Sequence, residues 1–147
     1  MCFENRSRMT NSRATKTVLT LETSLNEVLD CGCEFFAGRF YWTLFDRNPD
    51  LQPFFRDVNM QYQAAMLTMG LQVVVQHAGK TRRSSSDYLR LIGERHLTRG
   101  ITREHYQAFE EALLATLAEF HGDDWHDALA DQWRKAVRKA VETMLCQ

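Results

Sequence analysis

Tyr88-Leu-Arg-Leu-Ile-Gly-Glu-Arg-His96-Leu-Thr-Arg-Gly-Ile101 is the segment that most clearly indicates the fold of this chain. Its apolar residues return every three or four positions, which is the spacing of a helix with one apolar face. His96 follows Ile92 by four residues, so the two side chains share that face. Gly100 then stops the helix. The sequence therefore predicts a histidine held among apolar neighbours near a helix end.

Helical spacing continues on both sides of this segment, and no part of the chain alternates in the manner of a strand. A helix should end near Asn48 because the residue before Pro49 avoids the helical region, and Ser85 or Ser86 should cap the helix that carries His96. We therefore predict an all-α protein. The expected helices cover roughly residues 21–32, 35–48, 60–77, 86–100, 102–122 and 125–145, with a short helical turn at 51–55.

Composition limits the classes of protein that fit. The 147 residues are 44% hydrophobic and 25% charged, as in an ordinary soluble domain, and the formal net charge of −1 argues against nucleic-acid or anionic-membrane partners. No apolar run approaches the roughly 18 residues of a membrane helix or forms a signal peptide, so we expect a cytoplasmic protein. Residues 1–20, rich in polar residues, should be a disordered tail before one domain at 21–147.

The four cysteines form no recognisable disulfide framework. Cys31-Gly-Cys33 could hold a soft metal, but no second Cys or His pair stands at a matching spacing. We expect free thiols.

Residues on two other predicted helices suggest a function for His96. An iron porphyrin needs an apolar slot, an axial nitrogen ligand and control of the opposite face. Neutral imidazole is such a ligand when its other ring nitrogen has a hydrogen-bond acceptor. Tyr41 offers a phenolic donor, and Gln63 and Leu67, four residues apart, would place a donor beside a bulky apolar group. Two donors to a charged oxygen would contribute about 1–3 kcal/mol.

The order of these residues resembles bacterial single-domain globins and the globin domain of flavohaemoglobins, over about residues 21–146. The matching stretches are Phe40-Tyr41-x-x-Leu44-Phe45-x-x-x-Pro49-x-Leu51-x-Pro53-Phe54-Phe55, Gln63-x-x-x-Leu67, Gly93-x-Arg95-His96-x-x-x-Gly100-Ile101-x-x-x-His105-Tyr106 and, in the last helix, Trp133. The resemblance implies a globin fold, a three-over-three helical sandwich around haem b, and reversible binding of O₂, NO or CO.

The resemblance also implies a role for each site residue. His96 is the proximal iron ligand, Phe55 packs on the porphyrin, and Tyr41, Gln63 and Leu67 form the distal side. Gln61 is the alternative to Gln63, although it would pair with Ala65 instead of Leu67. Arg95 and Arg99 are candidates for the haem propionates, and the remaining expected cofactor contacts are Phe40, Phe54, Ile92, Ile101, Tyr106 and Phe109.

One departure from flavohaemoglobins concerns the proximal side. Their proximal histidine is polarised by a glutamate on the last helix, beside a tyrosine that Tyr106 matches. Counted from Trp133, this glutamate would fall beyond residue 147, and Glu142 comes too early. We therefore expect a backbone carbonyl to hold the His96 N–H, which favours gas binding over peroxidase-like chemistry.

Simpler interpretations apply to the other polar and sulfur-containing residues. His77 and His105 are expected to be exposed, although either could serve as a second axial ligand. Met66 and Met69 should fill gaps in the core.

Four functions fit this sequence. The leading hypothesis is reversible O₂ binding; the second is nitric oxide dioxygenation with a separate reductase, since no flavin or nicotinamide domain follows in the sequence. A gas sensor would need a partner protein. A haem-free helical interaction module is the last, and the presence of His96 and Tyr41 argues against it. The oligomeric state stays open.

Overall fold

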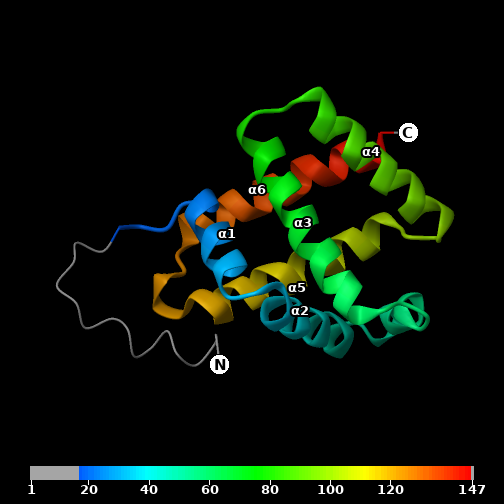
Figure 1. Cartoon of the computed structure of the whole chain (residues 1–147), viewed down its shortest axis with the longest axis horizontal. Helices are drawn as coiled ribbons and strands as arrows, with labels where there is room; N and C mark the ends of the chain where they lie inside the picture. Colours follow the sequence, from blue (N-terminus) through cyan, green and yellow to red (C-terminus); the bar gives the residue numbers. More distant parts are fainter. Residues whose placement is uncertain (1–16, 147) are drawn as a thin grey trace.

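The computed structural model describes residues 17–146, all of whose regular elements are helices. The elements are α1 (Leu21–Asp30), α2 (Cys33–Arg47), the 3-10 helix η2 (Pro49–Phe55), α3 (Met60–Gly79), α4 (Arg83–Thr98), α5 (Arg103–His121), the 3-10 turn η3 (Gly122–Asp124) and α6 (Asp127–Leu145). Helices α1, α3 and α4 lie over α2, α5 and α6, with α3 crossing the middle of the molecule (Figure 1). The predicted all-α fold is confirmed.

Local signals in the sequence account for most helix ends. The Thr20 hydroxyl accepts a hydrogen bond from the Thr23 amide and caps α1, and Pro49 ends α2. The Asn59 carboxamide oxygen accepts from the amides of Gln61 and Tyr62 and caps α3. Gly100, with a φ of +83°, lets the chain turn sharply after α4.

Two expected helix starts are wrong by a few residues. Helix α4 begins at Arg83, before either expected cap, because the Ser85 hydroxyl donates back to the Arg82 carbonyl and accepts from its amide. Helix α6 begins at Asp127 and excludes Trp125, since the His126 ring accepts from the Leu129 amide as the cap. Both corrections come from side-chain bonds that hydrophobic spacing does not reveal.

The expected tail falls partly outside the described residues, which begin at residue 17. Leu19 is buried and its carbonyl accepts from His126 Nε2, while Thr20 caps α1. These two residues therefore belong to the folded part, and the prediction of a disordered tail remains open for residues 1–16.

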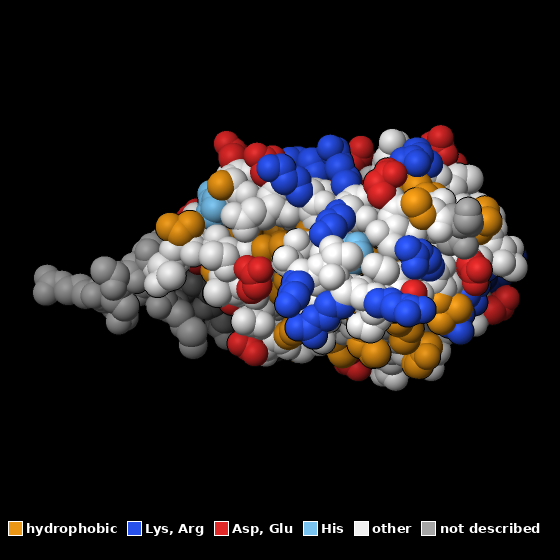
Figure 2. Space-filling view, turned by 90° about the horizontal axis from the view of Figure 1, so that it is seen from above, with side chains coloured by type: hydrophobic (Ala, Val, Ile, Leu, Met, Phe, Trp, Pro, Cys, Tyr) orange, Lys and Arg blue, Asp and Glu red, His pale blue; other side chains and the backbone are white. Residues whose placement is uncertain are grey.

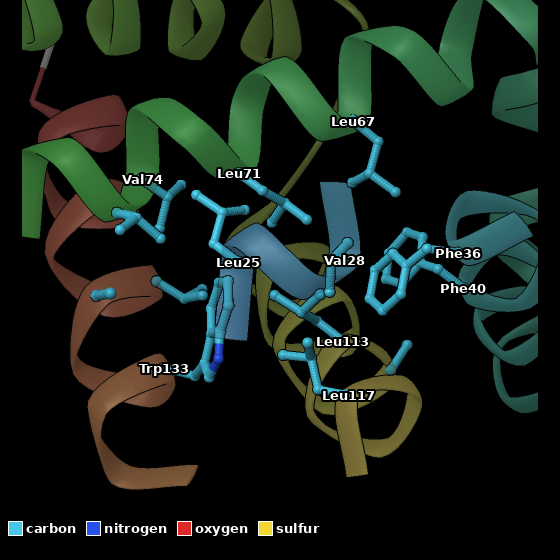
Figure 3. Packing of buried hydrophobic residues seen from close by; sticks show 14 of the residues in the cluster. Leu25, Val28, Phe36, Phe40, Leu67, Leu71, Val74, Leu113, Leu117 and Trp133 are labelled. Carbon is cyan, nitrogen blue, oxygen red and sulfur yellow. The ribbon is translucent and has the colours of Figure 1, made fainter. Parts of the chain in front are cut away.

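The hydrophobic core lies between the two layers of helices. Its labelled members in Figure 3 come from five helices: Trp133 of α6 lies near Leu25 of α1, and Phe36 and Phe40 of α2 lie across from Leu113 of α5. Each of these side chains is buried. Burial of a large aliphatic or aromatic side chain contributes about 1.5–3 kcal/mol, so this cluster holds the helices that carry the site. No helix within residues 17–146 is long and apolar enough to cross a membrane.

Candidate functional site

A mainly apolar cavity of about 770 Å³ lies among α2, η2, α3, α4, α5 and α6. Every residue expected to contact a cofactor lines it. These are Phe40, Tyr41, Phe54, Phe55, Gln63, Leu67, Ile92, Arg95, His96, Arg99, Ile101, Tyr106 and Phe109. Segments separated by more than sixty positions in the sequence thus form one site.

His96 lies in the last turn of α4 and is held at both its backbone and its ring. Its carbonyl accepts from the amides of Arg99 and Ile101, at 3.1 and 2.9 Å. Its Nδ1 lies 2.9 Å from the Tyr106 hydroxyl of α5. The expectation that a backbone carbonyl would hold this nitrogen is wrong, because the first turn of α5 places a phenol there instead.

The second ring nitrogen of His96, Nε2, has no hydrogen-bond partner among residues 17–146. The ring lines the cavity, so Nε2 is the nitrogen available to a group held there. Burial, with the nearby positive charge of Arg99, lowers the pKa of His96 below its usual value. The imidazole is therefore neutral at physiological pH, the form that can ligate a metal.

A hydrogen-bonded pair from α2 and α3 lines another part of the cavity. Gln63 Nε2 donates to the Tyr41 hydroxyl oxygen at 2.9 Å. Burial raises the pKa of Tyr41 to about 12, although the bond from Gln63 opposes the rise. Tyr41 thus keeps its proton, and since its oxygen accepts from Gln63, that proton is free to point elsewhere. The alternative Gln61 is exposed at the start of α3.

Aromatic rings surround this pair. Tyr41 lies against Phe40 and Phe55, with ring centroids 5.0 and 5.3 Å apart, and Phe40 also meets Phe109 of α5 at 5.2 Å. Leu67 is buried one helical turn from Gln63. The phenol and carboxamide therefore stand in a largely apolar, water-poor part of the cavity, where hydrogen bonds are stronger.

Two arginines on α4 and its C-terminal cap lie at the cavity's exposed edge. Arg95 and Arg99 line the cavity yet are exposed, and neither has an acidic side chain within 4 Å among residues 17–146. Figure 2, which looks onto the α4 side of the molecule, shows Lys and Arg side chains spread across this face. A ligand with acidic groups at its edge would meet cations here.

The wall of the cavity that α6 forms was not predicted from the sequence. Val137, Ala140, Val141 and Met144 of α6 line it beside α4. Their spacing of three, one and three is the apolar stripe of a helix, but the stripe alone does not tell which neighbour it faces. The α4–α6 packing turns it toward the site.

His77 and His105 were both expected to be exposed, and the expectation is wrong for both. His77 is buried, with Nδ1 3.1 Å from the Ser85 hydroxyl and Nε2 3.0 Å from the Thr143 hydroxyl. His105 is partly buried at the cavity edge, and its Nδ1 accepts from the Thr102 amide. Met66 lines the cavity, whereas Met69 is exposed and fills no gap.

The cysteines give no metal site. Cys33 and Cys146 are free thiols, whereas Cys31 is disulfide-bonded, so the expectation of a free thiol is wrong for Cys31. No group of three or more His, Cys, Asp or Glu side chains in the described part of the chain could hold a metal ion. Any metal at His96 would need most of its ligands from another group.

Comparison with known proteins now identifies the family. Residues 38–144 match the family model described as Globin. The chain belongs to the globin family. Its relatives include flavohemoproteins of Chromobacterium violaceum, 26% identical over 111 residues, and of Bacillus subtilis, 25% identical over 122 residues. Leghemoglobin-1 of Lupinus luteus is 32% identical over 87 residues.

The matches cover only part of each of these relatives. The matches cover 74% and 82% of this chain but only 27% and 30% of the two flavohemoproteins, and 58% of this chain against 51% of leghemoglobin-1. This globin thus spans less than a third of either flavohemoprotein and about half of leghemoglobin-1.

Membership of the globin family implies a haem cofactor, and the residues of this globin fit one. The cavity is mainly apolar, as a porphyrin requires. The neutral imidazole of His96 has one bonded nitrogen and one without a partner in the described chain, which would suit ligation to an iron that the porphyrin already coordinates. Arg95 and Arg99 supply positive charge where propionates would emerge.

Proposed function

We propose that this globin holds haem b and binds O₂ and other diatomic gases reversibly, with His96 Nε2 as the protein's iron ligand. The observation that carries the proposal is the pairing at each side of one cavity: His96 with Tyr106, and Tyr41 with Gln63, both at 2.9 Å. When bound, haem would supply a ferrous iron that takes up the gas. The protein's contribution is to orient these two pairs and to exclude water.

On the proximal side, Tyr106 would hold the tautomer of His96 that ligates the iron. With the proton on Nδ1, that nitrogen donates to the Tyr106 hydroxyl and leaves the lone pair of Nε2 for the iron. Burial raises the pKa of Tyr106, so the phenol stays neutral. A neutral oxygen is a weaker acceptor than a carboxylate, and His96 therefore remains an ordinary imidazole, which favours holding a gas over splitting it.

On the distal side, Gln63 aligns Tyr41. Its carboxamide fills one lone pair of the phenol oxygen, and the raised pKa of about 12 keeps the phenol proton in place. A polar ligand such as O₂ would accept this proton as a hydrogen bond, whereas CO would gain less. Leu67 and Phe55 would limit the room beside the ligand.

Optical spectra of the ferric, ferrous and CO-bound protein test this proposal. Purified protein supplied with haem should show a Soret band that shifts on reduction and again on CO binding. A protein with no Soret band after haem is supplied would contradict the proposal and favour a haem-free interaction module.

Nitric oxide dioxygenation is a second candidate, favoured by the same Tyr41–Gln63 pair and by the similarity to flavohemoproteins. Conversion of NO and O₂ to nitrate needs one electron per turnover, which a separate reductase would supply. We propose that this globin works in the cytoplasm. Sustained NO consumption with NADH and a reductase would support this function. A single stoichiometric event would count against it.

A further inference from the structure

Gly93 lies at a close approach between α4 and α6 near the site. It lies buried on α4, three residues before His96. A Cβ added to Gly93 would overlap the carbonyl oxygen of Met144 and lie 2.7 Å from its carbonyl carbon. Both atoms are backbone of α6, which cannot move aside as a flexible side-chain tip can.

No other glycine of this globin meets such an obstacle. The chain has seven glycines, all within the described residues. At Gly38 of α2 and Gly70 of α3, an added Cβ would meet nothing within 4 Å, and at Gly32 it would meet only the tip of the Phe35 ring, at 3.9 Å. Gly38 lies within α2 and does not line the cavity, which makes it a control for Gly93.

Two sets of side-chain contacts link the end of α6 to its surroundings, one through α3 to the start of α4 and one to the start of α5. Toward the start of α4, the buried His77 ring joins Ser85 of α4 to Thr143 of α6, at 3.1 and 3.0 Å. Beyond the end of α4, the guanidinium of Arg103 lies 3.1 Å from the Glu142 carboxylate. The end of α6 is thus held near both ends of α4, and Gly93 lies where the backbones of the two helices come close.

We propose that Gly93 is a positioning residue for His96: by allowing α4 to rest on the backbone of α6, it sets the depth of the imidazole in the cavity. The proposal rests on the proposed function, in which His96 ligates the haem iron. Alanine at residue 93 would need α4 and α6 to separate by at least about 1 Å to restore ordinary contact distances. His96, less than one turn away, would move with α4.

The test compares Gly93→Ala with Gly38→Ala in the haem-loaded ferrous protein, by the iron–histidine stretching band in resonance Raman spectra and by the CO association rate. Gly93→Ala should shift the band and change the rate severalfold, and Gly38→Ala should leave both unchanged. An unshifted band in Gly93→Ala would overturn the proposal.

A second background separates positioning from general damage. In His96→Gly supplied with imidazole, the proximal ligand is no longer attached to α4, so adding Gly93→Ala should leave the iron–imidazole band in place. If Gly93→Ala shifts the band equally in the unmutated and the His96→Gly proteins, the proposal is overturned. It is also overturned if Gly93→Ala prevents folding in both of these proteins. Thr143→Val removes the bond from His77 to the end of α6 without adding bulk at residue 93. It should shift the iron–histidine band less than Gly93→Ala does, and it should leave the iron–imidazole band of His96→Gly in place.

A measurement on the haem-free protein tests the role of Gly93 separately from the proposed haem function. In the apoprotein, the ¹⁵N chemical shifts of the His96 ring report its bond to Tyr106, with Tyr106→Phe as the reference for a lost bond. Gly93→Ala should move the shifts toward this reference and Gly38→Ala should not. Absence of a Soret band in the unmutated protein would contradict the haem function alone, whereas unchanged ring shifts in Gly93→Ala would contradict the role of Gly93.

Discussion

Three histidines on the helices of this globin are largely buried, and within residues 17–146 only His96 among them has an open ring nitrogen. His77 has Ser85 on one nitrogen and Thr143 on the other. His121 likewise lies 2.6 Å from the Ser24 hydroxyl and 3.2 Å from the Glu27 carboxylate. His96 has one partner, Tyr106, and a cavity beside its second nitrogen.

Among these three histidines, the number of bonded ring nitrogens separates the two that join helices from the proposed ligand. His105, partly buried at the cavity edge, also has one bonded ring nitrogen, Nδ1, so bonding alone does not assign the ligand. Burial alone does not, because all three rings are removed from solvent to a large degree. A ring with both nitrogens bonded joins helices together, whereas a ring with one nitrogen bonded is oriented and still able to react. We expect changes at His96 to alter spectra, and changes at the other two histidines to alter stability.

The largest effect is expected from His96→Ala. Loss of the only proposed protein ligand to the iron should weaken haem binding by more than about 100-fold, beyond the range for loss of an outer hydrogen-bond partner. Titration of apoprotein with haem, followed at the Soret band, measures it. His105→Ala at the cavity edge is the control, and equal haem affinity in the two variants would refute the assignment of His96.

The second effect concerns a histidine that joins helices. His121→Ala should lower the free energy of unfolding by about 2–4 kcal/mol, because Ser24 and Glu27 would lose a buried partner. Trp133 Nε1 would still donate to the Ser24 hydroxyl. Urea unfolding measures the loss, and the Soret spectrum of the folded variant should be unchanged. An altered iron–histidine band would contradict the distinction between the two kinds of histidine.

The third effect lies on the distal side. Tyr41→Phe removes the phenol donor and should raise the O₂ dissociation rate by one to two orders of magnitude, the equivalent of about 1–3 kcal/mol. Gln63→Leu, which leaves the phenol but removes its alignment, should give a smaller increase. Stopped-flow displacement of O₂ by CO measures both. Tyr62→Phe, at an exposed tyrosine of the cavity edge, is the control; an unchanged rate in Tyr41→Phe would remove the distal assignment.

The smallest effect is a pH dependence. Burial, with the charge of Lys139, lowers the pKa of His77 in the folded state. As the pH falls below about 6.5, the unfolded chain takes up a proton at this residue before the folded one does, so the free energy of unfolding should decline. Urea unfolding between about pH 7.5 and pH 5.5 should show a steeper decline than in His77→Gln. Parallel curves for the two proteins would show that His77 does not titrate as its burial requires.

Much of the site could be predicted from local sequence. Spacing placed His96 on the apolar face of its helix, and proline and glycine placed the ends of α2 and α4. The family resemblance then brought Tyr41, Gln63 and Leu67 to one cavity, and the structure places them there. The choice of Gln63 over Gln61 agrees with the structure because α3 begins at Met60, which leaves Gln61 exposed in the first turn.

Other features could not be predicted because they depend on which helices meet. His77 looks like a surface histidine in the sequence, and it is buried only because Ser85 and Thr143 arrive from two other helices. The Tyr106 hydroxyl reaches His96 because α5 starts directly after the turn at Gly100.

The helices, their apolar faces and the residue types of the site are specified along the chain, since they follow from interactions between residues a few positions apart. Three features arise only when the helices pack: how close α4 lies to α6, which ring nitrogen of each histidine is occupied, and the position of the Met144 carbonyl against Gly93. Packing distances between helices are set by backbone and side-chain volume on both partners at once. No spacing within a single helix contains that information.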